Sequence, residues 1–450
     1  MSFQTYSSYV DSGASWLGHI PSHWRPARLR TVFDIRKRIA GVEGYEVLSI
    51  TQRGIKVRDT ESNDGQLAAS YANYQIVEPG DFAMNHMDLL TGWVDRSRQL
   101  GVTSPDYRVF AIRSDAEVSP AFALYLLQNG YTQKVFFAFG QGSSHLGRWR
   151  LPTDGFLNFI APLPPLAEQA TIATFLDRET AKIDALVEQQ RRLIELLKEK
   201  RQAVISHAVT KGLDPTVPMK DSGVEWLGNV PKYWKVARLK WAVQSIEQGW
   251  SPQCEASRAE GPEEWGVLKV GCVNGGIFRP EENKALPREL NPMPELALQR
   301  GDILVSRANT RELVGSAALV PQDYSHLMLC DKLYRLRANE AIALPDFLAL
   351  YLQSNIAREA FELAATGASA SMVNIGQGTV MNLVITLPSL SEQQAIIDFI
   401  HSMQQRADAL VRASETAIHF LGERRAALIS AAVTGRIDVR SPFGRQAEAA

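Results

Sequence analysis

An apolar repeat with a period of seven residues runs through positions 168–209, and no Gly or Pro interrupts it. Its two seams hold Ile172, Leu176, Ile183, Leu186, Leu193 and Leu197. This spacing predicts one long helix with an apolar stripe along its length. At 1.5 Å per residue the helix is roughly 60 Å long. Such a stripe exceeds what one compact core covers, so the sequence predicts that the helix pairs with a second one.

The chain supplies the second helix itself, because positions 392–433 repeat the pattern 224 residues later. The corresponding seams hold Ile396, Ile400, Leu410, Leu421 and Leu428. Both segments begin with the motif Leu-Pro-x-Leu-x-Glu-Gln, which contributes Glu168-Gln169 to the first and Glu392-Gln393 to the second. The shared period, length and entry motif indicate an internal duplication, and we expect the two helices to pair antiparallel.

A further duplicated segment lies ahead of each helix. Trp16-Leu17-Gly18 and Trp24 return as Trp226-Leu227-Gly228 and Trp234, 210 residues later. We call this repeated Trp-Leu-Gly segment the box. The fixed spacing of the tryptophans in and after the box indicates a role in packing or in subunit contact. Because 210 differs from 224, the stretch between box and helix is longer in the second copy by about 14 residues. The sequence therefore predicts two modules that differ from each other, each enclosed by the same frame, which consists of the box before the module and the long helix after it.

We predict five parts along the chain. Residues 1–165 form the first module with its box, 166–212 the central helix, 213–389 the second module, 390–438 the C-terminal helix and 439–450 a tail. Within the modules, positions 46–51, 82–84, 109–112 and 301–305 are predicted strands. Positions 120–129 and 345–355 are predicted helices, and glycine-rich polar loops follow at 140–150 and 366–378.

Composition excludes several classes of protein. A length of 450 residues with 45% hydrophobic and 22% charged residues is typical of a globular protein with two or more domains. The N-terminal residues lack the pattern of a signal peptide and no apolar run is long enough for a membrane span, so we expect a cytoplasmic protein. The three cysteines have spacings that fit neither a zinc site nor a disulfide framework. The formal net charge of −1 means that any nucleic-acid binding depends on local basic patches.

The paired Trp-Leu-Gly boxes, the paired helix entries, the run 85–95 and the run 101–107 together resemble the specificity subunits of type I restriction-modification systems. The resemblance covers nearly the whole chain. It implies an α+β fold with two target-recognition domains, separated by two long antiparallel coiled-coil helices, and an internal pseudo-two-fold repeat. The second module departs from the pattern because it lacks the Ser-Pro-Asp-Tyr run of the first and has only Cys330-Asp331-Lys332-Leu333-Tyr334.

The resemblance also implies a function. Each module would read one half of a bipartite site in double-stranded DNA, and the chain would dock two methyltransferase subunits and, through the complex, the restriction and motor subunits. The chain would itself be non-catalytic and bind no cofactor. S-adenosylmethionine, ATP and Mg would belong to the partner subunits.

Candidate DNA contacts come from basic clusters and from amide and polar side chains in the same loops. Arg and Lys contact phosphates, Arg can read guanine by two hydrogen bonds, and Asn or Gln can read adenine. The candidates are Lys37, Arg38, Gln52, Arg53, Lys56, Arg58, Asn85, Gln141, Ser143, His145, Arg148 and Arg150 in the first module, and Arg307, Asn309, Arg311 and Asn374 in the second. For any single basic residue, a solvated surface charge is the alternative.

Two other classes of function remain as alternatives. The chain could be a coiled-coil scaffold whose modules bind proteins, which a gel-shift assay would distinguish from DNA reading. It could also be an enzyme, but no phosphate-binding loop, methyltransferase motif or nuclease carboxylate cluster is present in the sequence. His86 and His145 lack metal-ligand spacing, so base contact or plain exposure is the preferred interpretation of both.

Overall fold

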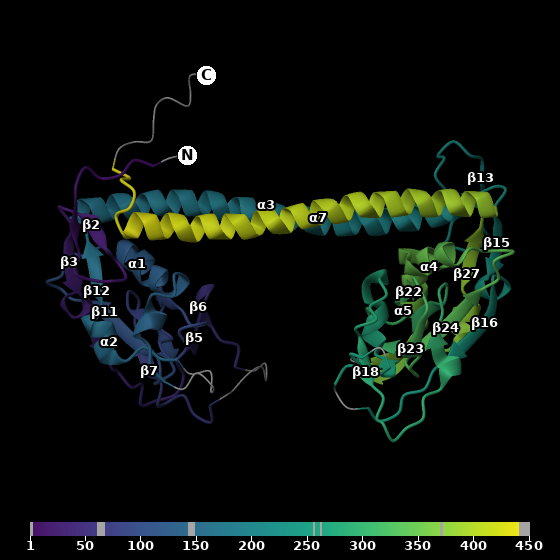
Figure 1. Cartoon of the computed structure of the whole chain (residues 1–450), viewed down its shortest axis with the longest axis horizontal. Coiled ribbons are helices and arrows are strands. Elements are labelled where there is room, and N and C mark those ends of the chain that lie inside the picture. The colour runs from purple at the N-terminus through teal and green to yellow at the C-terminus, as the bar shows by residue number, and fades with distance from the viewer. Residues whose placement is uncertain are drawn as a thin grey trace. The chain divides into compact units, whose positions relative to one another are not determined.

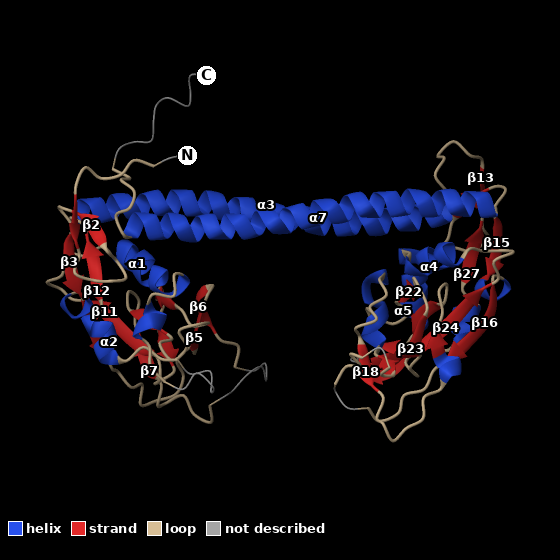
Figure 2. Cartoon of the chain, in the orientation of Figure 1, coloured by secondary structure: helices blue, strands red, loops and turns tan. Residues whose placement is uncertain are grey.

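The computed structural model describes residues 3–60, 68–142, 149–254, 257–261, 263–369 and 372–440. The chain divides into two compact units (Figure 1). Unit 1 comprises Met1–Gln190 with Glu415–Ala450, and unit 2 comprises Arg191–Ser414. Each unit mixes helices with short strands, which confirms the α+β class (Figure 2).

Two long helices contribute to both units. They are α3, Leu166–Lys211, and α7, Leu390–Val433. Helix α3 begins directly after Pro164-Pro165 and ends before Gly212, whose φ of 80° is left-handed. Helix α7 ends two residues before Gly435, which has a φ of 75°. Helix α3 has nearly its predicted bounds of 166–212, whereas α7 ends five residues before the predicted 438, because the chain turns at Gly435.

Within each unit the two helices pair antiparallel. In unit 1, Arg425 Nε lies 3.0 Å from Asp184 Oδ1, and in unit 2 Arg201 Nη1 lies 3.5 Å from Asp408 Oδ1. Asp184 and Asp408 are separated by 224 positions, as are Arg201 and Arg425. The same interhelical ion pair is therefore made twice, once by each copy of the duplicated sequence.

One predicted seam of the helix pair is wrong towards the middle of the helices. Ile172, Leu176 and Ile183 are buried as expected, but the side chains of Leu186 and Leu193 are 45% and 39% exposed. The adjacent Val187 packs on the core of unit 1 instead. Leu410, the equivalent of Leu186 in α7, is 51% exposed. A shift of one position rotates the stripe by about 100°.

The remaining residues predicted to pack between the helices are buried or half-buried. Ile396 and Ile400 are fully buried and Leu428 is buried, while Leu197 and Leu421 are half-buried. The wrong seam has a simple cause, because both copies place aliphatic residues beside each other around it, as in Leu186-Val187 and Leu193-Ile194 of α3. Periodicity cannot choose between two adjacent apolar stripes, and the packing of the module against the helix does so.

Unit 1 contains a four-stranded sheet in the order β4-β11-β8-β9, three two-stranded pairs beside it and the pair β3–β12 next to the long helices. Its strands are β1 Tyr9–Asp11, β2 His19–Pro21, β3 Arg25–Arg28, β4 Phe33–Arg36, β5 Leu48–Thr51, β6 Gly54–Val57, β7 Gln75–Val77, β8 Phe82–Met84, β9 Val94–Arg96, β10 Gly101–Thr103, β11 Arg108–Ile112 and β12 Ile160–Leu163. Its helices, besides parts of α3 and α7, are η1 Leu29–Thr31, α1 Pro120–Thr132, η2 Phe136–Phe139 and α2 Thr153–Asn158.

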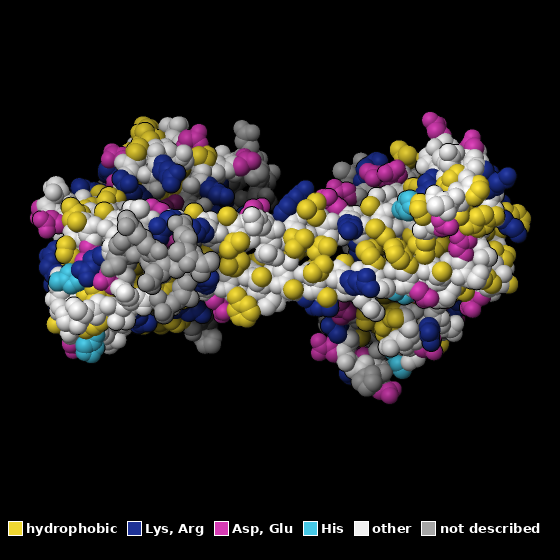
Figure 3. All heavy atoms as spheres, turned by 90° about the horizontal axis from the view of Figure 1, so that it is seen from above, with side chains coloured by type: hydrophobic (Ala, Val, Ile, Leu, Met, Phe, Trp, Pro, Cys, Tyr) yellow, Lys and Arg dark blue, Asp and Glu magenta, His cyan; other side chains and the backbone are white. Residues whose placement is uncertain are grey.

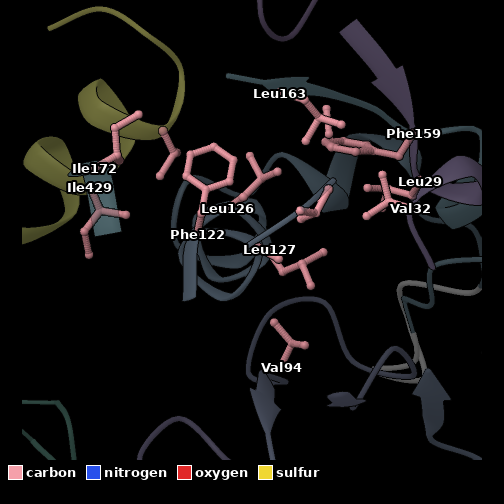
Figure 4. Packing of buried hydrophobic residues seen from close by; sticks show 14 of the residues in the cluster. Leu29, Val32, Val94, Phe122, Leu126, Leu127, Phe159, Leu163, Ile172 and Ile429 are labelled. Atoms are coloured by element: carbon pink, nitrogen blue, oxygen red, sulfur yellow. The ribbon is translucent and has the colours of Figure 1, made fainter. Parts of the chain in front are cut away.

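The core of unit 1 joins the long helices to the module. Ile172 of α3 and Ile429 of α7 lie on the side of the helix pair nearest α1, and Phe122 and Leu126 of α1 lie between them and the strands (Figure 4). Burial of each such side chain stabilises the unit by about 1.5–3 kcal/mol. The module is thus fixed to its stretch of the helix pair by apolar packing.

Unit 2 contains the four-stranded sheets β16-β24-β20-β22 and β18-β17-β23-β19, the three-stranded sheet β21-β26-β25 and two two-stranded pairs. Its strands are β13 Met219–Asp221, β14 Asn229–Pro231, β15 Lys235–Arg238, β16 Val243–Gln248, β17 Gly266–Leu268, β18 Asn283–Ala285, β19 Ala297–Leu298, β20 Ile303–Ser306, β21 Ala308–Asn309, β22 Ala317–Leu319, β23 Tyr324–Met328, β24 Leu333–Ala338, β25 Thr366–Ser369, β26 Met372–Asn374 and β27 Val384–Leu387. Its helices are η4 Leu239–Trp241, η5 Val270–Gly276, η6 Pro294–Leu296, α4 Pro345–Gln353, α5 Asn355–Ala364 and α6 Gln377–Met381.

The duplicated box and helix entry meet in both units. In unit 1, Trp24 Nε1 donates to Glu168 Oε1 over 3.1 Å, and in unit 2 Trp234 Nε1 donates to Glu392 Oε2 over 3.0 Å. Both tryptophans are buried, which confirms their packing role. Trp16 stacks on Phe159 with ring centroids 5.0 Å apart, whereas Trp226 is exposed. The repeated motifs therefore hold each module on the start of its long helix.

Two segments far apart in the sequence complete unit 1. Tyr9 Oη donates to the carbonyl of Gly435 over 3.1 Å, and the amide of Asp438 donates to the carbonyl of Gln4 over 2.8 Å. The residues after α7 are thus hydrogen-bonded to the N-terminal segment that contains β1. Over the described residues, no helix is both long enough and apolar enough to cross a membrane.

Candidate nucleic-acid interface

Four of the predicted contacts in unit 1 lie on the β5–β6 hairpin. Gln52 and Arg53 form its turn, Lys56 lies on β6 and Arg58 follows that strand. Gln52, Arg53 and Lys56 are exposed and Arg58 is half-buried. Gln52 Nε2 donates to the carbonyl of Thr91 over 3.3 Å, which ties the turn to the loop before β9. The hairpin therefore presents two or more positive charges at one edge of the module.

A second group gathers where β8 ends. Asn85 and His86 follow β8 directly, and the amide of Leu151 donates to the carbonyl of His86 over 2.9 Å. This bond brings Arg150 to the strand end, and Gln141 comes with it because Gln141 and Arg150 form an isolated antiparallel bridge. Gln141 and Arg150 are exposed and Asn85 is half-buried. Residues separated by 65 positions thus form one polar cluster.

Of the two interpretations of His86, base contact and plain exposure, the second is wrong because the residue is half-buried. Its pKa is lowered to about 4, mainly by burial and also by the positive charges of Arg108 and Arg150, against a backbone hydrogen bond at Met84 that raises it. Its Nδ1 atom is buried without a hydrogen-bond partner among the described residues. At neutral pH the imidazole is uncharged and can offer a neutral donor or acceptor.

Arg38 differs from the other candidates because two carboxylates already hold it. Its guanidinium forms ion pairs with Glu78 and Asp81, and Asp81 is buried. These pairs fix the loop that precedes β8. Lys37 beside it is exposed. A phosphate contact from Arg38 would have to replace these pairs, whereas Lys37 is accessible in the structure as it stands.

In unit 2 the four predicted residues lie in one region. β21 pairs with β26 so that Ala308 is opposite Asn374, and Arg307 precedes β21. Arg307 Nη1 donates to the carbonyl of Asp331 over 3.3 Å, and Asn309 Nδ2 donates to Asn274 Oδ1 over 3.3 Å. Arg307, Asn309 and Asn374 are half-buried, so part of each side chain reaches solvent.

Arg311 of unit 2 is exposed and donates from Nη1 to the carbonyl of Glu362 over 3.4 Å. Three predicted residues of the first module, Ser143, His145 and Arg148, lie outside the described residues. The structure therefore assembles 13 of the 16 candidates into a hairpin group, a strand-end group and Lys37-Arg38 in unit 1, and a strand-end group with Arg311 in unit 2.

The two strand-end groups correspond to each other. Asp81-Phe82-Ala83-Met84 matches Asp302-Ile303-Leu304-Val305, so His86 and Arg307 occupy equivalent positions after the strand. Arg150 and Asn374 are likewise equivalent, being separated by 224 positions. The frame is the same in both units, while the side chains on it differ.

Sequence reasoning missed Arg108. It is 4% exposed, it lies 4.8 Å over the ring of Phe156, and its Nη2 donates to the carbonyl of Leu151 over 3.1 Å. Burial lowers its pKa to about 10, so it stays protonated at neutral pH. One signal was present in the sequence, since Arg108 is the single charge that opens the apolar run Val109-Phe110-Ala111-Ile112.

The described residues do not assemble a catalytic centre that we can identify. No group of three or more His, Cys, Asp or Glu among them could hold a metal ion. Burial raises the pKa of the Cys330 thiol to about 12 and raises that of Cys272 well above its usual value. Neither thiol is therefore a nucleophile at neutral pH.

Comparison with known proteins agrees with this arrangement. The sequence model of one family, described as the type I restriction modification DNA specificity domain, matches residues 267–418. The EcoEI specificity subunit of Escherichia coli is 28% identical over 231 residues, which cover 50% of this chain. The EcoKI specificity subunit of Escherichia coli K12 is 25% identical over 280 residues, which cover 61% of this chain.

The chain is similar in sequence to specificity subunits of type I restriction enzymes. The matched segments span 39% and 57% of the lengths of the EcoEI and EcoKI subunits. One solved structure is described as the structural basis underlying complex assembly and conformational transition of the type I R-M system. A chain of that structure superposes on this one with a TM-score of 0.63. It is 17% identical, and the match covers 92% of this chain and 98% of that one. At this identity the likeness shows a shared fold and nothing beyond it.

Proposed function

We propose that this chain is the non-catalytic DNA-reading subunit of a type I restriction-modification complex. Each unit would read one half of a bipartite site in double-stranded DNA. The observation that carries the proposal is the strand-end group of Arg, Asn and Gln side chains, which occurs at equivalent places in both units. Similarity to type I restriction enzyme specificity subunits supports the choice of DNA as the ligand.

The proposed contacts fall into two classes. Arg53, Lys56 and Lys37 are exposed and suit phosphates, which position the duplex without selecting a sequence. Asn85, Gln141 and Arg150 in unit 1, and Arg307, Asn309 and Asn374 in unit 2, stand at the strand ends and suit base edges. We include Ser143, His145 and Arg148 among the proposed DNA contacts because they lie between Gln141 and Arg150 in the sequence.

Two methyltransferase subunits would dock on the long helices. Hydrophobic side chains reach the surface along both helices (Figure 3). Unit 1 exposes Leu186 of α3 and Phe420 of α7, and unit 2 exposes their counterparts Leu410 of α7 and Leu196 of α3. Exposed apolar side chains of this size mark interaction surfaces when they gather. Because the pair occurs once in each unit, the proposal requires two equivalent docking surfaces.

The register of the helices places the two members of each pair at nearly the same level along the helix axis. In unit 1, Asp184 lies opposite Arg425, so Leu186 and Phe420 are displaced from this pair in the same direction along the antiparallel helices. They differ by three residues along the axis, which is about 4.5 Å. The same relation holds in unit 2 around Arg201 and Asp408.

The restriction and motor subunits would join through the methyltransferase subunits. S-adenosylmethionine, ATP and Mg would bind to these partners and not to this chain. A DNA-reading role in a prokaryotic host also implies a cytoplasmic location. Purified chain assayed with S-adenosylmethionine and DNA should transfer no methyl groups, and addition of the methyltransferase subunit should produce transfer.

Gel-shift competition tests DNA reading directly. The complex of this chain with its methyltransferase subunit should bind a duplex carrying the host's methylated motif with at least a hundredfold preference over a shuffled duplex of the same length, since specific binding commonly exceeds non-specific binding by 10³ or more. Equal competition by both duplexes would favour the scaffold alternative, in which the modules bind proteins.

Copurification tests the docking surfaces. Tagged methyltransferase subunit should saturate at two copies per chain, because the duplicated frame offers its surface twice. Substitution Leu186→Ser with Phe420→Ser should leave one copy bound, as should Leu410→Ser with Leu196→Ser. A single copy on the unaltered chain at saturation would contradict the symmetry of the proposal.

A further inference from the structure

In both units a polar hairpin returns to the module at one buried aliphatic residue. This residue is Leu151 in unit 1 and Ile375 in unit 2, separated by 224 positions and 0% and 2% exposed. Directly before each lies the last residue of the hairpin, Arg150 bridged to Gln141 in unit 1 and Asn374 paired with Thr366 in unit 2. The buried residue is therefore the root from which the proposed DNA contacts project.

The backbone ties each root to the strand end in the same way. The amide of Leu151 donates to the carbonyl of His86 over 2.9 Å, and the amide of Ile375 donates to the carbonyl of Arg307 over 3.0 Å. His86 and Arg307 are themselves equivalent positions. This first tie uses only main-chain atoms, so it does not depend on the side chains present.

A second tie comes from a side chain on the neighbouring strand. Arg108 Nη2 donates to the carbonyl of Leu151, and Tyr334 Oη donates to the carbonyl of Ile375, each over 3.1 Å. Arg108 of β11 pairs with Met84, and Tyr334 of β24 pairs with Val305, which is the same place in the two sheets. Both side chains are buried, at 4% and 3% exposed.

The chemistry of the two side chains differs although the bond is the same. Arg108 carries a positive charge, and its Nη1 is buried with no partner among the described residues. Tyr334 has one donor, its hydroxyl, and the carbonyl of Ile375 accepts this hydrogen bond. Because the hydroxyl of Tyr334 makes the same bond in unit 2, a guanidinium is not required at this position to hold the carbonyl.

We propose that Arg108 and Tyr334 are equivalent positioning residues, each of which fixes the root of a DNA-reading hairpin and so sets where Arg150 and Asn374 stand against the bases. The inference rests on the proposed function of DNA reading. Hydrogen bonds to base edges require donor–acceptor distances near 3 Å, so a displaced root weakens the choice of base more than it weakens overall binding.

The test compares two chemically identical changes in unit 2. Tyr334→Phe removes the bond to Ile375, and Tyr351→Phe removes a bond of the same kind, from buried Tyr351 of α4 to the carbonyl of Val384 over 3.1 Å. Each variant is expressed with the methyltransferase subunit, and the methylated motif is sequenced. Tyr334→Phe should lower the discrimination between bases in one half-site by about tenfold, while Tyr351→Phe should leave the motif as in the unaltered chain.

The corresponding test in unit 1 uses a rescue. Arg108→Met should broaden the other half-site only, and Arg108→Tyr should restore it, because a tyrosine hydroxyl makes this bond in unit 2. If Arg108→Met fails to fold, the Tyr334 and Tyr351 variants decide the question by themselves.

The possible results separate the inference from the function on which it rests. If the unaltered complex produces no methylated motif, the proposed function fails. If the motif exists and Tyr334→Phe leaves it unchanged, or if Tyr351→Phe broadens it equally, the positioning role is wrong. An Arg108→Tyr variant that stays as broad as Arg108→Met would overturn the equivalence of the two residues.

Discussion

At the scale of single residues, the strand end of unit 1 combines a neutral histidine with a buried cation. His86 has a pKa lowered to about 4 by burial and by the charge of Arg108, whereas the unfolded chain titrates near the ordinary value of 6.5. Below pH 6.5 the unfolded state therefore binds more protons than the folded state. The contribution of uncharged His86 to the stability of unit 1 is therefore fully present above pH 6.5 and is lost as the pH falls from 6.5 towards 4.

A variant can isolate this effect. His86→Gln should remove the acid sensitivity, which amounts to at most about 3 kcal/mol for a shift of this size. Hydrogen exchange of the β8 and β11 amides at pH 5 and pH 7 measures it within unit 1. His419→Gln alters an exposed histidine of α7 and should leave the pH dependence of the unaltered chain intact. Equal acid sensitivity in His86→Gln would show that other groups cause it.

At the scale of elements, the long helices show how packing selects one of two apolar stripes. Ile183 is 5% exposed and Leu186 is 45% exposed, although they lie three residues apart on α3. The core of unit 1 packs against Ile172, Leu176, Ile183 and Val187. Leu186 and its counterpart Leu410 therefore remain at the surface, where a partner subunit can reach them.

The two positions should respond differently to the same change. Ile183→Asp buries a carboxylate among apolar side chains and should destabilise unit 1 by about 3 kcal/mol or more. Leu186→Asp leaves the carboxylate in water and should change the free energy of unfolding by about 0.5 kcal/mol or less. Urea unfolding followed at the amides of α3 gives both values. If Leu186→Asp lost as much stability as Ile183→Asp, Leu186 would have to be buried and the prediction would be wrong.

At the scale of the whole chain, the duplication gives equivalent positions at which both helices can be altered together. Gln190 and Ser414 are separated by 224 positions, and the division between the two compact units falls directly after each. Seven residues inserted after both keep the seven-residue seams in phase. The ion pairs Asp184–Arg425 and Arg201–Asp408 then stay within their own units in the original register.

This double insertion tests whether the helices set the spacing of the proposed half-sites. Seven residues lengthen each helix by about 10.5 Å, or about three base pairs at 3.4 Å per step. The methylated motif should keep both half-sites and gain a spacer longer by about three base pairs. Insertion into α3 alone is the control and should abolish activity, because it breaks the register with α7. An active double variant with altered half-sites and an unaltered spacer would contradict the prediction.

The sequence by itself determined the long helices and the repeated frame. The signals for these are local: no Gly or Pro lies inside α3, Pro164-Pro165 precedes it and Gly212 follows it. The repeated Trp24 and Glu168 positions also predicted a shared frame, and their contact in both units is its physical basis. The predicted strands at 82–84 and 109–112 and the helix from Pro120 have the same local origin.

Only the tertiary structure decided the rest, because it depends on segments that meet from distant parts of the chain. The choice of Val187 over Leu186 came from packing against the module, since both residues are apolar and periodicity allows either. The ion pairs of Arg38 come from Glu78 and Asp81, and the burial of His86 comes with the return of the chain at Leu151. Arg108 and Tyr334 look unrelated in sequence, and their common role follows from the carbonyl that each one reaches across the sheet.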